Sequence, residues 1–293
     1  MLDLKGSGVA LITPFNEDNS INYSVVSKLI EFHIINNTDF IVVCGTTGES
    51  ATLSTKEKKE LIRFVVEKVN KRIPVIAGTG TNDTLSTIKL SSYAKSIGVD
   101  GILLVTPYYN KGNEKGIYLH YKEIASSVFP LPIILYNVPS RTGVNLTNSQ
   151  IISLAEISNI IGIKEADTDI SKISSLLFAL KRSNLDFKVF SGNDNLTLPI
   201  STLGGSGVIS VCANIIPNQM HDICINNDLD LYYNYFNLIN ILFLDTNPIM
   251  IKYAMNLMGL NVGNVRLPLY NPSDSKIAIL KDELSKLNLL KHL

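Results

Sequence analysis

Eight short apolar runs recur along the chain, and each has the length of a β-strand. They are rich in β-branched residues and mostly bounded by polar ones, which is typical of strands buried on both faces of a parallel sheet. The runs are Gly8–Thr13, Phe40–Cys44, Ile73–Ala77, Gly101–Val105, Pro132–Tyr136, Ile160–Lys164, Phe187–Phe190 and Gly207–Val211.

Segments between these runs carry apolar residues at helical spacing. In residues 54–69 the apolar side chains fall on one face, and Ser54 with Glu57 has the sequence of a capping box. Residues 83–97 and 149–157 have the same character. Strands that alternate with helices at intervals of roughly 20 to 33 residues predict parallel βα units with right-handed crossovers. Eight such units favour a closed (β/α)8 barrel over an open doubly wound sheet.

The strand pattern stops after about Pro217. Residues 230–244, 248–258 and 275–289 have helical patterns instead. A chain of 293 residues has room for a barrel of about 250 residues with a small appendage. We therefore predict a barrel domain over residues 1–224 and a C-terminal helical domain over residues 225–293.

Composition narrows the class of partner. Lys and Arg together number 26, as do Asp and Glu, and no segment carries a block of like charge, so the chain is not expected to bind nucleic acid or a membrane. No run has the length of a membrane span, and the N-terminal residues make no convincing signal peptide. The three cysteines and four histidines lack metal-ligand spacing. We expect a cytoplasmic protein that needs no metal and acts on a small molecule.

The sixth run, within NIIGIKEA (159–166), ends in Lys164. A solvated lysine that closes a strand is the ordinary interpretation, because lysine is rarely buried. In a (β/α)8 barrel, however, the C-terminal strand ends form the active site. An amine that loses its hydration there is more easily deprotonated and can condense with a ketone as a Schiff base.

Other strand ends bring polar groups to the same face. Tyr136 could exchange protons beside Lys164, or it could be an aromatic cap on the core. Thr46 and Thr47 lie in a loop that could hold a carboxylate, or that could be only a tight turn. Arg141 could bind a carboxylate bidentately, against the commoner fate of a surface salt bridge.

The motifs together carry a resemblance. In order, they are GTTGES (45–50), TPYYN (106–110), YNVPSRTG (136–143), GIKEA (162–166), SGND (191–194), GVISV (207–211) and NPIMIKYA (247–254). The set spans almost the whole chain and resembles the dihydrodipicolinate synthase family of pyruvate-dependent class I aldolases and lyases. The resemblance implies a (β/α)8 barrel followed by a helical C-terminal domain.

The resemblance also implies roles for site residues. Lys164 would form the Schiff base with pyruvate. The proton relay would comprise Thr46, Tyr136 and Tyr109, with Tyr109 supplied by a neighbouring subunit. Substrate contacts would come from Thr46 and Thr47 for the pyruvate carboxylate, from Arg141 for the second carboxylate, and from the backbone carbonyls of Gly192 and Ile209.

The implied reaction condenses pyruvate with L-aspartate 4-semialdehyde to give 4-hydroxy-tetrahydrodipicolinate, the first committed step of diaminopimelate and lysine biosynthesis. It needs no cofactor, and the family usually forms a homotetramer built from dimers, although some members stop at dimers. The sister enzymes, N-acetylneuraminate lyase and keto-deoxy-sugar-acid aldolases, are the alternative, but the threonine pair and Arg141 favour a short carboxylated aldehyde. A protein that only binds pyruvate is disfavoured, because all the relay residues are present.

Family members that lysine inhibits bind it at a subunit interface. Many inhibited bacterial enzymes have histidines at the positions of Thr55 and Lys58 and a glutamate at that of Ser86. The substitutions here would pair poorly with a cationic ligand, so we predict weak or absent inhibition. The matching positions in this chain are Ser50, Ala51, Thr55, Lys58, Asn82, Ser86 and Tyr108.

Overall fold

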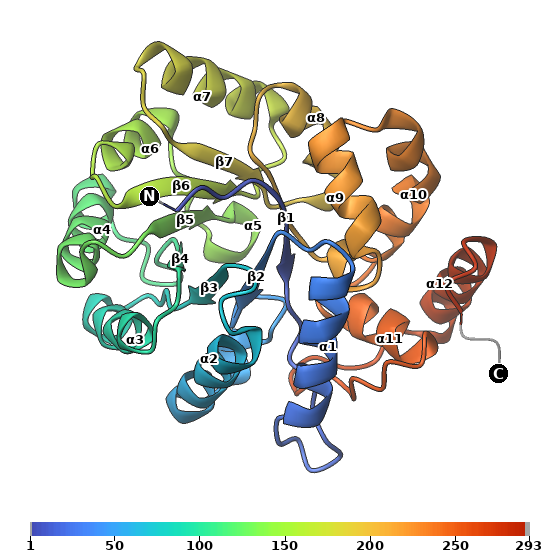
Figure 1. Ribbon diagram of the computed structural model, residues 1–293. Helices are drawn as coiled ribbons and strands as arrows, with labels where there is room; N and C mark the ends of the chain where they lie inside the picture. The colour runs from blue at the N-terminus through green and yellow to red at the C-terminus, as the bar shows by residue number, and fades with distance from the viewer. Residues whose placement is uncertain (1, 291–293) are drawn as a thin grey trace.

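Eight parallel strands close into a barrel in sequence order in the computed structural model, which describes residues 2–290 (Figure 1). Each strand pairs with the next along the chain, and β8 pairs with β1. The predicted (β/α)8 barrel is therefore confirmed. The strands are β1 (Gly6–Ala10), β2 (Phe40–Val43), β3 (Val75–Gly78), β4 (Gly101–Val105), β5 (Ile133–Asn137), β6 (Ile160–Glu165), β7 (Lys188–Ser191) and β8 (Gly207–Ser210).

Helices surround the strands in Figure 1. The capping box predicted at residues 54–57 is present, because the Ser54 hydroxyl accepts from the Glu57 amide and the Glu57 carboxylate accepts from the Ser54 amide. The helices of the barrel are α1 (Tyr23–Ile35), α2 (Thr55–Val69), α3 (Thr84–Ser96), α4 (Glu114–Val128), α5 (Pro139–Thr142), α6 (Asn148–Ala155), α7 (Ile170–Arg182), α8 (Thr197–Thr202) and α9 (Pro217–Asn226).

The first strand differs from its predicted range. It begins at Gly6 and ends at Ala10, whereas the apolar pattern predicted residues 8–13. The Leu11 amide still bonds to β2, but the Ile12 amide donates to the side chain of Asn214. A long-range side-chain contact thus replaces the ladder, which no local apolar pattern can predict.

Side chains along the strands alternate between two cores, with one irregularity in β6. On β5, Ile134 and Tyr136 belong to the apolar cluster inside the barrel, while Ile133 and Leu135 pack in the larger cluster that includes the helices. This alternation is the ordinary period of a strand. The alternation decides which side chains at the strand ends point into the barrel, where the active site of this fold lies.

The C-terminal helices lie to one side of the barrel, coloured orange to red in Figure 1. They are α10 (Leu229–Ile241), α11 (Ile249–Leu257) and α12 (Asp274–Lys286), as the three helical patterns predicted. Helix α9 packs on β1 and β8, so the predicted division after residue 224 falls in its last turn. The division into two domains stays a prediction. No helix within residues 2–290 is long and apolar enough to cross a membrane.

Candidate active site

Lys164 lies inside the barrel near the end of β6. The pairing of β5 with β6 shifts by one residue at Ile161, so Ile161 faces the interior although Ile163, two residues later, faces the helices. Regular alternation from Ile163 turns Lys164 inward. Its side chain is not solvated, because Lys164 is only 5% exposed. It pairs in register with Tyr136 on β5, and its Nζ lies 4.6 Å from the centroid of the Tyr136 ring. A buried amine thus lies beside a phenol, as a Schiff-base site requires.

A polar clamp joins the same two strands on their opposite face. Asn137 follows Tyr136, and its amide nitrogen donates to both carboxylate oxygens of Glu165, at 2.8 and 3.1 Å. Glu165 follows Lys164 and is fully buried. Burial raises the pKa of its carboxyl group, against the opposing charge of Lys172. The clamp fixes the register that holds Tyr136 and Lys164 side by side.

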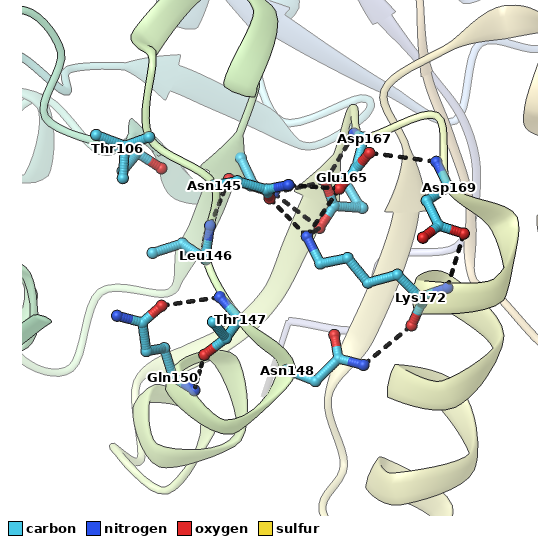
Figure 2. A network of polar contacts seen from close by, with 12 residues as sticks. Thr106, Asn145, Leu146, Thr147, Asn148, Gln150, Glu165, Asp167, Asp169 and Lys172 are labelled. Atoms are coloured by element: carbon cyan, nitrogen blue, oxygen red, sulfur yellow. Dashed lines mark hydrogen bonds and ion pairs between the residues drawn. The ribbon is translucent and has the colours of Figure 1, made fainter.

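Lys172 on α7 extends this network outward. Figure 2 shows its ammonium group among Asn145, Glu165 and Asp167, at 2.6 Å from the Asn145 side-chain oxygen and 3.0 Å from an Asp167 oxygen. Burial would raise the pKa of Asp167, but hydrogen bonds from Asn145 and Lys172 outweigh it and lower that pKa to about 2. A charged network therefore holds the ends of β5 and β6 from outside the barrel.

The turn after β2 carries the two threonines. Thr47 is buried, and its Oγ1 accepts a hydrogen bond of 3.0 Å from the side chain of Asn247. Thr46 is half-buried, and its carbonyl oxygen accepts from the amide of Glu49, which closes the turn. The hydroxyls and amides of this turn are suited to a small carboxylate.

Arg141 comes from α5, the short helix after β5. Its Nη2 donates to the backbone oxygen of Asn247 at 3.0 Å. No carboxylate of residues 2–290 lies within ion-pair distance of it, so the surface salt bridge considered from the sequence is not found there. The guanidinium therefore keeps donors available for a substrate carboxylate.

A cavity of about 340 Å³ opens at the C-terminal ends of β2 to β5. Thr46, Tyr136 and Arg141 line it together. Four residues of the predicted lysine site line the same cavity, namely Ser50, Ala51, Lys58 and Tyr108. Burial lowers the pKa of Lys58. The cavity thus brings Thr46, Tyr136 and Arg141 together with a partly desolvated cation. Its lining does not include four other predicted site residues, namely Thr47, Lys164, Gly192 and Ile209.

Tyr109 is not brought to this cavity in the protomer. It is 89% exposed, with a left-handed backbone (φ 67°), on the loop after β4. Three residues of the predicted lysine site also lie outside the cavity lining. Thr55 begins α2, the Asn82 carbonyl accepts from Asn110, and Ser86 lies in the first turn of α3.

Gly192 and Ile209 are found at the ends of β7 and β8. Gly192 lies where two chain segments approach closely, because an added Cβ would be 2.7 Å from that of Ala166. Ile209 is fully buried within the barrel. Both positions belong to the same end of the barrel as Lys164.

Sequence reasoning assigned no role to Asp194, which is 1% exposed. One carboxylate oxygen accepts from the amides of Val211 and Cys212, tying the end of β7 to the end of β8. Burial raises the pKa of Asp194, and hydrogen bonds from Ser210 and the Cys212 amide, followed by the charge of Lys164, partly offset the rise. The sequence feature that could have indicated Asp194 is its place in SGND (191–194), directly after the predicted strand over residues 187–190. Asn247 was also missed as a contact, although NPIMIKYA was noted as a motif.

The fold and site define a class of protein: a (β/α)8 barrel with a buried lysine on β6 beside a tyrosine on β5, the arrangement of a Schiff-base-forming aldolase or lyase. Residues 3–287 match the model of the dihydrodipicolinate synthetase family. The chain belongs to this family.

Individual relatives agree with that assignment. A 4-hydroxy-tetrahydrodipicolinate synthase of Clostridium tetani is 50% identical, over 98% of this chain and 99% of the relative. The crystal structure of dihydrodipicolinate synthase from Aquifex aeolicus is 42% identical, covers 98% of this chain and 100% of its own, and has a TM-score of 0.93. That of the chloride-inhibited enzyme from Acinetobacter baumannii, complexed with pyruvate, is 43% identical with the same coverage and a TM-score of 0.94.

Proposed function

We propose that this chain is a lyase that condenses pyruvate with L-aspartate 4-semialdehyde through a Schiff base on Lys164, giving 4-hydroxy-tetrahydrodipicolinate. The reaction begins diaminopimelate and lysine biosynthesis. The observation that carries the proposal is the buried Lys164 amine, 4.6 Å from the ring centroid of Tyr136 at the active-site end of the barrel. Relatives that match nearly the whole chain are named for this reaction.

The residues allow the steps to be assigned. The Lys164 amine adds to the ketone of pyruvate and water leaves, which gives a protonated imine that can accept electrons. Tyr136 then passes on a proton lost from the methyl group, with Thr46 and Tyr109 completing the relay. The resulting enamine attacks the aldehyde carbon of the second substrate. The amine of that substrate finally displaces Lys164 and closes a six-membered ring.

Two carboxylates need separate sites. The pyruvate carboxylate lies close to Lys164 because it is bonded to the reacting carbon, and the buried turn with Thr46 and Thr47 meets it there. The carboxylate of the longer aldehyde extends toward the mouth of the cavity, where Arg141 lies. This arrangement favours a short anionic aldehyde over a polyhydroxylated sugar acid.

The Arg141 site gives a test of the substrate assignment. Replacing Arg141 by alanine should reduce kcat/KM for aspartate semialdehyde by about a hundredfold or more, because a charge-assisted contact is lost. Pyruvate trapping by borohydride should be unaffected. The matched control is Arg182→Ala, at an exposed arginine in the last turn of α7, which should retain full activity. An unchanged kcat/KM, or faster cleavage of N-acetylneuraminate by the parent protein, would refute the assignment.

The exposed Tyr109 supports a shared active site. The Tyr109 phenol is 89% exposed and lies outside the cavity lining of its own protomer, so it is available to a neighbouring copy. We therefore place the chain in a homo-oligomer, a tetramer built from two dimers. Cys44, Cys212 and Cys224 are all buried free thiols, which suits the reducing cytoplasm.

Inhibition by lysine should be weak or absent up to millimolar concentrations. Lysine brings two ammonium groups, whereas the cavity presents the partly buried Lys58, and position 86, outside the cavity lining, carries serine and no acid. An effector acts only through its differential affinity for two states, so a poorly held one has little effect. A titration of turnover measures this, with the Lys58→His/Ser86→Glu variant expected to gain inhibition. Half-inhibition of the parent below about 1 mM lysine would contradict it.

A further inference from the structure

A buried ion pair connects the turn after β2 with helix α11. The Nζ of Lys252 lies 2.9 Å from a carboxylate oxygen of Glu49, and the two side chains are 2% and 1% exposed. The same ammonium group donates to the backbone oxygens of Thr13 and Asn264, at 3.0 and 2.7 Å. All three of its N–H groups therefore have partners, and Phe15 covers it at 4.2 Å from the ring centroid.

The ion pair holds a turn that is unfavourable by itself. Glu49 has a left-handed backbone (φ 53°, ψ 35°), which costs a non-glycine residue roughly 1 kcal/mol or more. Its amide donates to the carbonyl oxygen of Thr46, and its second carboxylate oxygen accepts from the amide of Arg266 at 2.8 Å. Lys252 and Arg266, both in the C-terminal part of the chain, thus fix the Glu49 side chain. The Glu49 amide in turn closes the turn that begins at Thr46.

A second contact from the same segment reaches both predicted carboxylate sites. Asn247, just before α11, donates from its side chain to Thr47, and its backbone oxygen accepts from Arg141. Residues 247–252 therefore contact every element of the cavity to which a substrate carboxylate is assigned. They lie about 200 residues along the chain from Glu49 and Thr47.

Stability alone does not explain such a pair. Replacing a buried ion pair by apolar groups is often neutral or stabilising, because desolvation offsets the attraction. Here burial lowers the pKa of Lys252 to about 8 despite the neighbouring Glu49, so the desolvation is substantial. A buried pair at this place needs another reason.

We propose that Glu49 and Lys252 are positioning residues for the pyruvate carboxylate. They fix the turn whose hydroxyls and amides receive that carboxylate. Glu49 also lines the cavity, but its two carboxylate oxygens already accept hydrogen bonds from Lys252 and Arg266. The proposal rests on the proposed function, because it assumes that pyruvate occupies the site beside Lys164. It assigns to the C-terminal helices a direct part in setting pyruvate affinity.

Three variants test the proposal: Glu49→Gln, Lys252→Met and the double variant. The readout is the pyruvate concentration that gives half-maximal borohydride trapping on Lys164, measured beside Tm. Each single change should lower Tm, since it leaves a buried partner uncompensated. The double variant should recover most of the Tm, yet its half-saturating pyruvate concentration should remain raised about tenfold. Its KM for aspartate semialdehyde should change by less than about twofold, because Arg141 is still held by Asn247.

The Glu31→Gln/Arg72→Met variant is the control for the loss of an ion pair elsewhere, because it removes a half-exposed pair between α1 and the turn after α2, outside the cavity lining. It should leave pyruvate saturation unchanged. A double variant, or Glu49→Gln if the double variant does not fold, that saturates with pyruvate as the parent does would overturn the proposal. Failure of the parent protein to trap pyruvate at all would instead refute the proposed function.

Discussion

Replacing Lys164 by alanine should remove turnover almost completely, by roughly 10⁴-fold or more, since the covalent route disappears with its nucleophile. Alanine adds no charge and shortens a side chain that points into the barrel beside Tyr136, so the fold should persist. Steady-state kinetics with pyruvate and aspartate semialdehyde measure the loss. A circular dichroism spectrum equal to that of the parent separates lost chemistry from lost structure.

The control for this variant is Lys122→Ala, because Lys122 is an exposed lysine on α4. Its kcat should equal that of the parent. If Lys164→Ala keeps more than about one per cent of the parent kcat, another group must form the covalent intermediate, and Lys164 belongs to the structure alone.

Tyr109→Phe should lower kcat by about 10² to 10⁴-fold, the usual worth of a positioned proton donor. The change removes one hydroxyl group from a side chain that is 89% exposed in the protomer, so the folding stability of each subunit should not change. Measurement of kcat at a concentration where light scattering shows an intact oligomer isolates the effect of the hydroxyl.

Mixing two inactive variants tests whether the active site is shared between subunits. Combining Tyr109→Phe with Lys164→Ala subunits should restore activity in hybrid oligomers, because one site then receives its lysine from one chain and its tyrosine from the other. No recovery in hybrids, or full activity in a dissociated protomer, would show that the active site is not shared.

Much of the fold follows from local pattern. Strands buried on both faces are continuous apolar runs, and the eight runs predict the barrel because each βα unit has only one favourable handedness. Strand ends are harder to predict. The pattern extends β1 to Thr13, but Asn214 binds the Ile12 amide and ends the ladder at Ala10.

The candidate site likewise has one part that local pattern predicts and one part that it does not. Residues near the end of a strand, such as Lys164 in β6 and Tyr136 in β5, are predictable because parallel strands all end at one face of the barrel. Contacts between distant segments are not, because no local spacing places Asn247 beside Thr47 or Lys252 beside Glu49. Tyr109 illustrates a further limit, since its implied partner groups lie on another copy of the chain.

The most direct test of the account is reduction of the protein with borohydride in the presence of pyruvate, followed by intact mass measurement and peptide mapping. We expect one reduced pyruvyl group per chain, attached to Lys164, and none in Lys164→Ala. Label on any other lysine, or no label while aspartate semialdehyde is still consumed, would contradict the Schiff-base chemistry assigned to this barrel.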